Sequence, residues 1–182
     1  MFPLVIDLRG RRVVVIGAGR VGTDKARQLL DAGALVTVIS KELLTALPDG
    51  VSLFVERAYQ YGDLDGALLA VAATGNGDVN DEIVREANER NVLLNVVDDL
   101  GRSAFYFTAN YRDGEVLVSV STGGASPALA QWVRNRVASA LPRNLASVAS
   151  RLRAERAALH SQGHSTENRP WMQRVEQLVE EL

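Results

Sequence analysis

The sequence contains no cysteine. Disulfide bonds, thiolate metal ligands and cysteine nucleophiles are therefore excluded. Two histidines, His160 and His164, are four residues apart, but Gly163 interrupts the helix that would place them on one face. We therefore expect no metal site, and we interpret the polar stretch at 161–170 as a solvated linker.

Neither positive nor negative charge is in large excess, because the sequence has 20 Lys and Arg residues and 22 Asp and Glu residues. This balance gives no argument for binding nucleic acid or an anionic membrane surface. No run of about 18 consecutive apolar residues is present, so we expect no membrane span. Residues 1–12 place their charges after the apolar stretch and lack a small-residue cleavage site, unlike a signal peptide. We expect a cytoplasmic protein without nucleic-acid or membrane partners.

A glycine-rich turn joins an apolar strand pattern at 13–17 to an amphipathic helix pattern at 20–32. In this G-x-G-x-x-G motif, Gly17 allows a tight turn, Gly19 lets the backbone approach a pyrophosphate, and Gly22 lets the helix lie close to the strand. The positive end of the helix would face the phosphates. The alternative is a purely structural turn. The motif predicts a dinucleotide-binding site that includes Gly17, Gly19, Arg20, Val21 and Gly22.

The rest of the first half continues the alternation of strands and helices. This order predicts an α/β fold with a Rossmann-type doubly wound parallel sheet. The further strands are expected at 34–39, 51–56, 66–74 and 91–97, and a second helix at 78–90.

After the parallel sheet the pattern changes. Strands are expected at 104–111 and 115–122, joined by an Asp113-Gly114 hairpin turn. Helices follow from Ser126 with a break near Pro142, and the apolar stripe of the last helix must be buried within the chain or against a partner. We divide the chain into an NAD-binding domain at 1–111, a dimerisation segment at 112–145 and a C-terminal helical module at 146–182.

Three strand ends carry candidate site residues. Ser40 and Lys41 stand where many Rossmann proteins have an acidic ribose ligand. They either hydrogen-bond a ribose or tolerate a 2′-phosphate, or Ser40 merely caps a following short helix. Ala73 and Thr74 follow the fourth strand, where small residues leave room for a ligand or simply make a tight turn.

Two carboxylates, Asp98 and Asp99, close the fifth strand at the edge where such sheets bind ligands. One of them could face the cleft, where partial desolvation would favour a general base. The alternative is a solvated turn. Because side chains alternate along a strand, we expect the two carboxylates to point to different faces.

A second glycine-rich loop precedes the helix that begins near Ser126. We interpret Ser126 as the N-cap and Pro127 as the first helical residue. The glycines expose backbone donors at a positive helix end, which suits a carboxylate or phosphate. A plain capping turn is the alternative. The predicted substrate-binding residues are Thr122, Gly123, Gly124 and Ser126.

Together these motifs resemble the precorrin-2 dehydrogenase family, the oxidase and ferrochelatase module of siroheme synthesis, a branch of porphyrin biosynthesis. The resemblance runs from Phe2-Pro3-Leu4 through G-A-G-R-V-G, A-A-T and N-V-V-D to S-T-G-G-A-S-P-A-L-A and Pro142. N-V-V-D followed by S-T-G-G-A-S-P is its most specific part. After Pro142 only a generic helical module is similar, and the resemblance is to the stand-alone form.

The resemblance implies an oxidoreductase that uses NAD to convert precorrin-2 to sirohydrochlorin, working as a homodimer. Some members also insert Fe²⁺ to give siroheme, and the sequence leaves this activity open, as it does NAD against NADP. The family's catalytic aspartate corresponds to Asp98. The substrate carries eight carboxylates, for which Arg102, Arg112 and Arg134 are candidate partners or plain surface charges. Where the family usually has proline after N-V-V-D, this chain has Thr108.

Two functions of other classes stay open. An NAD-sensing regulatory domain needs only the first half of the chain and leaves the S-T-G-G-A-S-P segment unexplained. A dimeric scaffold built on the C-terminal helices would make the glycine motif a remnant, and NAD binding separates that possibility from the other two.

Overall fold

The computed structural model describes residues 1–167 and 169–182. The chain forms two compact units, residues 1–106 and 107–182. Each unit is described by itself below.

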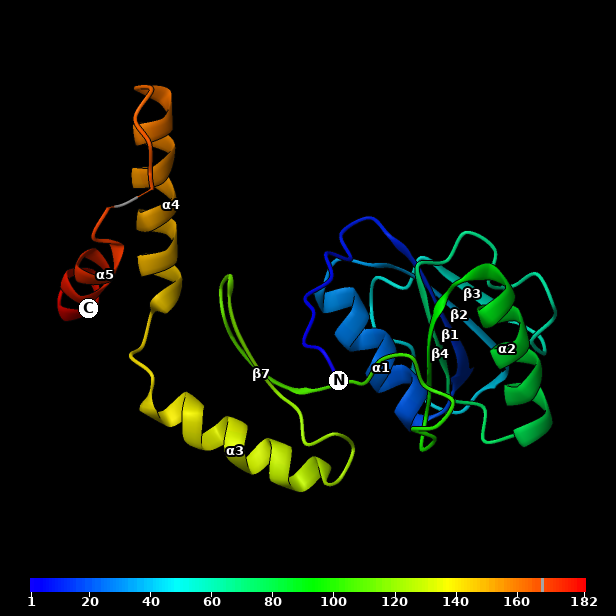
Figure 1. Cartoon of the computed structure of the whole chain (residues 1–182). Coiled ribbons are helices and arrows are strands. Elements are labelled where there is room, and N and C mark those ends of the chain that lie inside the picture. The colour runs from blue at the N-terminus through cyan, green and yellow to red at the C-terminus, as the bar shows by residue number, and fades with distance from the viewer. Residues whose placement is uncertain (168) are drawn as a thin grey trace. The chain divides into compact units, whose positions relative to one another are not determined.

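A five-stranded parallel sheet in the order β3-β2-β1-β4-β5 forms the centre of the first unit (Figure 1). The chain runs outward from β1 to β2 and β3, and then returns to the other side of β1 for β4 and β5. Ligands bind outside the carboxyl ends of the strands at such a reversal. The strands are β1 (Arg12–Ala18), β2 (Leu35–Leu43), β3 (Leu53–Glu56), β4 (Leu69–Ala72) and β5 (Leu93–Val96).

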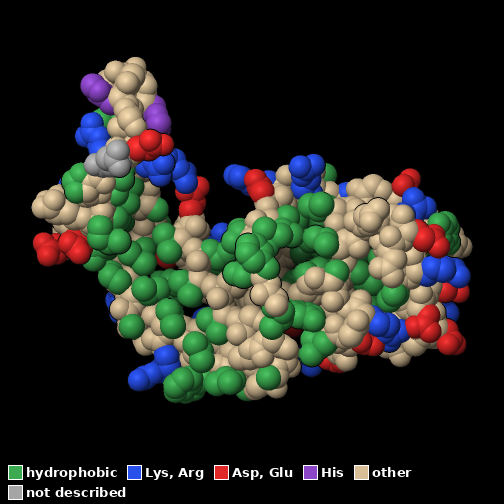
Figure 2. All heavy atoms as spheres, in the orientation of Figure 1, with side chains coloured by type: hydrophobic (Ala, Val, Ile, Leu, Met, Phe, Trp, Pro, Cys, Tyr) green, Lys and Arg blue, Asp and Glu red, His purple; other side chains and the backbone are tan. Residues whose placement is uncertain are grey.

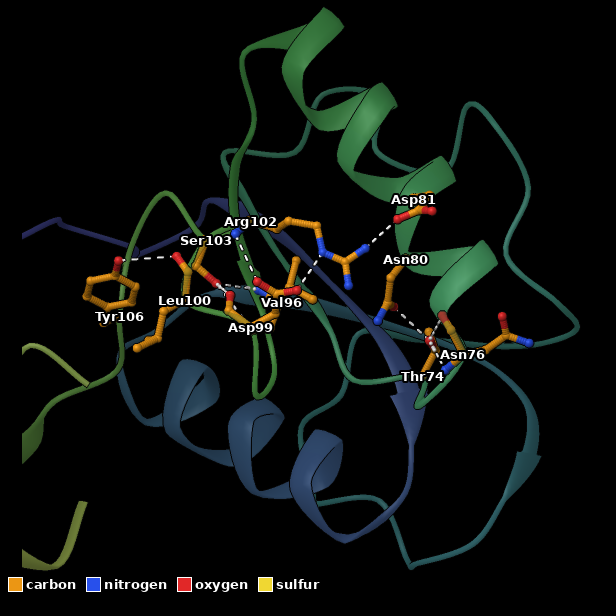
Figure 3. A network of polar contacts seen from close by, with 10 residues as sticks. All are labelled: Thr74, Asn76, Asn80, Asp81, Val96, Asp99, Leu100, Arg102, Ser103 and Tyr106. Carbon is orange, nitrogen blue, oxygen red and sulfur yellow. Dashed lines mark hydrogen bonds and ion pairs between the residues drawn. The ribbon is translucent and has the colours of Figure 1, made fainter. Parts of the chain in front are cut away.

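Two helices, α1 (Arg20–Asp31) and α2 (Gly77–Arg90), lie on opposite sides of this sheet (Figures 1 and 3). Side chains of successive strand residues point to opposite faces. Val14 and Ile16 accordingly belong to the apolar cluster that includes Ile83 of α2, while Val13 and Val15 are equally buried outside that cluster. A sheet covered on both faces explains the nearly continuous apolar strands. The predicted doubly wound α/β fold is confirmed.

The connections differ from the expected alternation of strands and helices. No helix joins β2 to β3 or β3 to β4 among these fully described segments. β2 also continues to Leu43 after a register shift that pairs Ala18 with Leu43. The short helix that Ser40 was to cap is therefore absent, and that alternative is wrong.

Glu86 of α2 holds the irregular connection between β3 and β4 in place through hydrogen bonds. Its side chain is fully buried and accepts hydrogen bonds from the Tyr59 hydroxyl, from Gly62 N at 3.0 Å and from Leu64 N at 3.2 Å. Arg90 Nε lies 2.7 Å from Oε1 as an ion pair, although its N–H direction makes no hydrogen bond. Burial and the hydrogen bond to Glu86 raise the pKa of Tyr59. This fully described loop therefore contains no helix and is ordered by its hydrogen bonds to one buried carboxylate.

Substitution of Glu86 should lower stability strongly. We expect Glu86→Ala to reduce the free energy of unfolding by about 3 kcal/mol, because several buried donors lose their partner. Urea denaturation followed by circular dichroism measures this change. Glu82→Ala, an exposed position on the same helix, is the control and should change stability by less than about 0.5 kcal/mol. Equal midpoints for the two variants would contradict the assigned role.

The second unit begins with an antiparallel hairpin, β6 (Ala109–Asp113) and β7 (Val116–Val120). The hairpin turn at Gly114 is as predicted, whereas residues 104–108 are not a strand. Instead the first two residues of this segment are hydrogen-bonded to β5: Ala104 N donates to Leu94 O at 2.7 Å, and Asn95 Nδ2 donates to Phe105 O at 2.9 Å.

Three helices complete the second unit: α3 (Pro127–Ala140), α4 (Leu145–Ser161) and α5 (Trp171–Glu180). Helix α3 packs on the hairpin, and α5 packs on α4. Leu178 of α5 is fully buried, and the Arg174 guanidinium pairs with Glu155 of α4. Within the apolar stripe of the last helix, Leu178 is thus buried inside the chain, Trp171, Val175 and Val179 are half-buried, and Leu182 is 50% exposed.

Within the described residues, no helix combines the length and apolar character needed to cross a membrane. No group of three or more His, Cys, Asp or Glu residues in the same part of the chain could hold a metal ion.

Candidate dinucleotide site at the carboxyl edge of the sheet

Two of the three motif glycines are required by the fold itself. Gly17 has φ +105°, and a Cβ there would collide with the carbonyl oxygen of Ala73. A Cβ on Gly22 would collide with the carbonyl oxygen of Gly17. These contacts bring the β1 turn, the start of α1 and the end of β4 together at the reversal point of the sheet.

Gly19 has no such reason to be glycine. Its φ of −80° and ψ of 178° are open to any residue, and a Cβ built there meets nothing within 4 Å. The space beside Gly19 is therefore free of protein atoms. The fold does not explain why position 19 is glycine. A glycine at the start of a helix does, however, leave room for a ligand to come close to the backbone.

The start of α1 offers unused donors to that space. Gly19 provides no side-chain cap, and the first turn of the helix carries no acidic residue. Thr23 N donates to Gly19 O at 2.9 Å, but the amides of Arg20, Val21 and Gly22 have no hydrogen-bond partner among the described residues. Unpaired amides at a positive helix end bind phosphate.

Ser40 and Lys41 lie in the last part of β2, where its pairing with β1 shifts register, beside this turn. Ser40 Oγ accepts a hydrogen bond from Ala18 N at 3.2 Å and donates to Glu42 O at 2.7 Å. The Ser40 hydroxyl proton is thus already used, and toward a ligand the oxygen can only accept. The Lys41 side chain is exposed at the same edge.

Thr74 is held in place by α2, a link that the sequence pattern did not indicate. Its hydroxyl lies 2.7 Å from Asn80 Oδ1 and accepts a hydrogen bond from Asn76 N at 3.1 Å (Figure 3). Asn80 is buried, and Asn76 caps α2 by accepting from Val79 N. An asparagine on a helix carries no sequence signal for this role, because its partner lies on another element.

Asp98 lies in a turn beyond the end of β5 and not within the strand. Asp99 N donates to Val96 O at 3.1 Å, and Asp98 has φ +62°, in the left-handed region. The Asp98 carboxylate is exposed and has no hydrogen bond or ion pair among the described residues. The strand alternation expected for Asp98 and Asp99 does not apply, so that argument was wrong.

Asp99 and Arg102 pair with each other. Arg102 Nε lies 2.7 Å from Asp99 Oδ2, and this hydrogen bond lowers the pKa of Asp99. Arg102 also pairs with Asp81 of α2. Its expected role as a partner for substrate carboxylates is therefore not supported, because Nε and Nη1 already contact protein carboxylates.

The second glycine-rich loop belongs to the second unit. Ser126 caps α3 by accepting from Leu129 N at 3.2 Å, and Pro127 is the first helical residue, as expected. Thr122 Oγ1 accepts from Ser126 N at 3.1 Å, while Gly123 and Gly124 have φ +65° and +84°. The turn geometry itself thus accounts for both glycines.

The two remaining candidate arginines also lie in the second unit. Arg134 Nη1 donates to Asn110 O at 3.0 Å, whereas Arg112 is exposed on β6. The predicted site residues of the first unit lie at the carboxyl edge of its parallel sheet, in the strand ends and in the turns that follow them: Gly17, Gly19, Arg20, Val21, Gly22, Ser40, Lys41, Ala73, Thr74 and Asp98.

Curated relatives match most of this chain. The siroheme synthase of Azotobacter vinelandii is 39% identical over 160 residues, which cover 84% of this chain and 34% of that protein. The siroheme synthase of Photorhabdus laumondii is 36% identical over 151 residues, 81% of this chain and 32% of that protein. The chain thus spans about a third of the length of these relatives.

A solved structure named "SirC, precorrin-2 dehydrogenase" has the same fold. It superposes with a TM-score of 0.71 at 23% identity, over 100% of this chain and 88% of that one.

Two family models match consecutive parts of the chain. Residues 4–109 match the family described as "Putative NAD(P)-binding", and residues 116–140 match "Sirohaem biosynthesis protein central". The first match covers more than half of the chain and contains the whole site built above. The chain therefore belongs to this NAD(P)-binding family, and a segment similar to the sirohaem biosynthesis model follows the matched domain. The two matches confirm the resemblance inferred from the motifs.

Proposed function

We propose that the protein catalyses NAD-dependent oxidation of precorrin-2 to sirohydrochlorin in the cytoplasm. The observation that carries this proposal is the open space at Gly19 beside unpaired α1 amides, on the same sheet edge as an unpaired carboxylate, Asp98. The names of the siroheme synthase relatives and of the precorrin-2 dehydrogenase structure support the choice of substrate.

The residues present fit a dinucleotide. The amides of Arg20, Val21 and Gly22 would hold the pyrophosphate, and Ser40 with Lys41 would lie beside the adenosine ribose. Ala73 and Thr74 would border the middle of the cofactor. When bound, NAD supplies the acceptor for the hydride that leaves the substrate.

Asp98 would take the proton that leaves when the substrate is dehydrogenated. A general base must be free to accept a hydrogen bond from its substrate, and in the described part of the chain the Asp98 carboxylate has no competing partner. Asp99 is less suited, because both of its oxygens accept from Arg102.

The substrate carboxylates would be held by the loop that contains Thr122, Gly123, Gly124 and Ser126, with Arg112 and Arg134 as further cations. If Fe²⁺ is a second substrate, Asp98 would also accept the pyrrole protons that the metal displaces.

An anaerobic assay with enzymatically made precorrin-2 tests this function. We expect the sirohydrochlorin spectrum to appear on addition of NAD, more slowly with NADP, and a further spectral change on addition of Fe²⁺ if chelation occurs. NAD binding without any spectral change would instead support the NAD-sensing alternative.

We propose that the protein is a homodimer whose interface uses residues 104–140. The second unit buries few apolar side chains, and on α3 Leu129 and Trp132 are 50% and 61% exposed. Figure 2 shows hydrophobic side chains gathered along this helix. Exposed aromatic residues of this kind are typical anchors of interfaces.

Trp132→Asp should therefore weaken the dimer at least about 30-fold, the effect of removing an interface anchor. Sedimentation velocity at micromolar concentrations measures the change. Met172→Asp, at a 72% exposed position on α5 outside the segment, should leave the dimer intact. A monomeric wild type would refute the proposal.

A further inference from the structure

The turn that carries Asp98 is tied to helix α2 through one arginine. Arg102 N donates to Asp99 Oδ1 at 3.1 Å and Arg102 Nε donates to Asp99 Oδ2 at 2.7 Å. The Nη1 group of the same side chain reaches Asp81 on α2 (Figure 3). Arg102 therefore spans the distance between the turn after β5 and the helix before it.

The neighbouring residue of α2 holds the other side of the site. Asn80 contacts the Thr74 hydroxyl at 2.7 Å, at the end of β4 (Figure 3). Asn80 and Asp81 are consecutive, so one turn of α2 is connected both to the loop after β4 that contains Thr74 (the Thr74 loop) and to the turn after β5 that contains Asp98 (the Asp98 turn). A shared rigid element is what fixes the geometry between two parts of a site.

We propose that Arg102 is a positioning residue, which sets the place of Asp98 relative to the Thr74 loop by tying the Asp98 turn to α2 through Asp81. This inference rests on the proposed function, in which Asp98 is the base and Thr74 borders the cofactor. It also assigns Arg102 a role other than holding substrate carboxylates.

The turn itself does not depend on this tie. Ser103 Oγ accepts from Val96 N at 2.9 Å and donates to Asp99 O at 2.7 Å, which closes the turn from its other end. Loss of the ion pair with Asp81 should therefore leave the fold unchanged and the turn formed on average, although the turn opens more often. It should loosen the position of the turn against α2, which affects the rate and not cofactor binding.

Asp81→Asn tests the tie at an exposed position, because the Asp81 side chain is 71% exposed and its loss leaves no buried charge. We expect kcat for precorrin-2 oxidation to fall about fivefold. One exposed ion pair is weak, so its loss can lower the fraction of molecules with the turn in the productive position only by a factor of this size. The KM for NAD and the melting temperature should not change. Arg102→Gln, which also loses the contacts with Asp99, should show a larger fall of kcat with the same KM.

Glu82→Gln is the matched control, since Glu82 is an exposed carboxylate on the same helix that makes no hydrogen bond or ion pair among the described residues. It should keep the wild-type kcat. Equal kcat in Asp81→Asn and Glu82→Gln would overturn the proposal. A lower kcat in Asp81→Asn that is accompanied by a lower melting temperature would also overturn it, because loss of stability would then explain the lower rate.

Hydrogen exchange by mass spectrometry supplies a second readout that needs no turnover. Amides of residues 97–101 should exchange faster in Asp81→Asn and Arg102→Gln than in wild type, and at the wild-type rate in Glu82→Gln. Unchanged exchange in Asp81→Asn would overturn the tie. If wild type does not oxidise precorrin-2, the proposed function fails, and the exchange data still decide whether Arg102 holds the turn.

Discussion

Asp98→Asn is expected to lose at least about a hundredfold of kcat for precorrin-2 oxidation, the lower range for removal of a positioned general base. Asparagine is the appropriate replacement, because Asp98 has φ +62° and asparagine tolerates this conformation whereas alanine does not. The fold should therefore be unchanged. Stopped-flow absorbance under anaerobic conditions measures the rate, and calorimetric titration should show unchanged NAD affinity.

Asp99→Asn provides the comparison for this variant. Asp99 contacts Arg102 and not the ligand space, so its substitution should act only through the position of the turn and cost much less. A larger loss of kcat in Asp99→Asn than in Asp98→Asn would show that the wrong carboxylate was assigned as the base.

Gly19→Asp is expected to weaken NAD binding by at least about a hundredfold, because a carboxylate would stand against the pyrophosphate and like charges in contact cost several kcal/mol. The protein should remain folded, since a Cβ at Gly19 meets no described protein atom within 4 Å and the backbone there suits any residue. Titration calorimetry with NAD and thermal denaturation of the free protein measure the two effects.

Gly22→Ala separates ligand binding from folding. A Cβ there collides with the carbonyl oxygen of Gly17, so this variant should lower the melting temperature, which Gly19→Asp should not. Unchanged NAD affinity in Gly19→Asp would refute the assignment of the phosphate loop.

The parallel sheet could be predicted because its strands are apolar throughout and its two helices show a clear amphipathic period. The connection between β3 and β4 could not, because a single buried carboxylate on a distant helix orders it. No local pattern contains that information. The end of β5 was placed too late for a related reason: Val97 continues the apolar run, but the chain already turns there.

The candidate site divides in the same way. The spacing of the glycines identifies the motif in the sequence. Their different roles can be distinguished only in the structure, from the atoms that a Cβ at each position would meet. Asn80, Asp81 and Arg102 act on residues of other elements, which places them beyond sequence reasoning. The family resemblance singled out Asp98, and the turn geometry explains why its neighbour is not equivalent.

The left-handed conformation at position 98 also constrains how this protein can diverge. Of the residues that tolerate a positive φ without strain, asparagine and glycine are each one base change from an aspartate codon. Either change would keep the turn and leave the dinucleotide site untouched while removing the carboxylate. With Asp98 as the proposed base, a descendant that has lost turnover but still folds and binds NAD is a single mutation away. Such a descendant would be a starting point for a cofactor sensor.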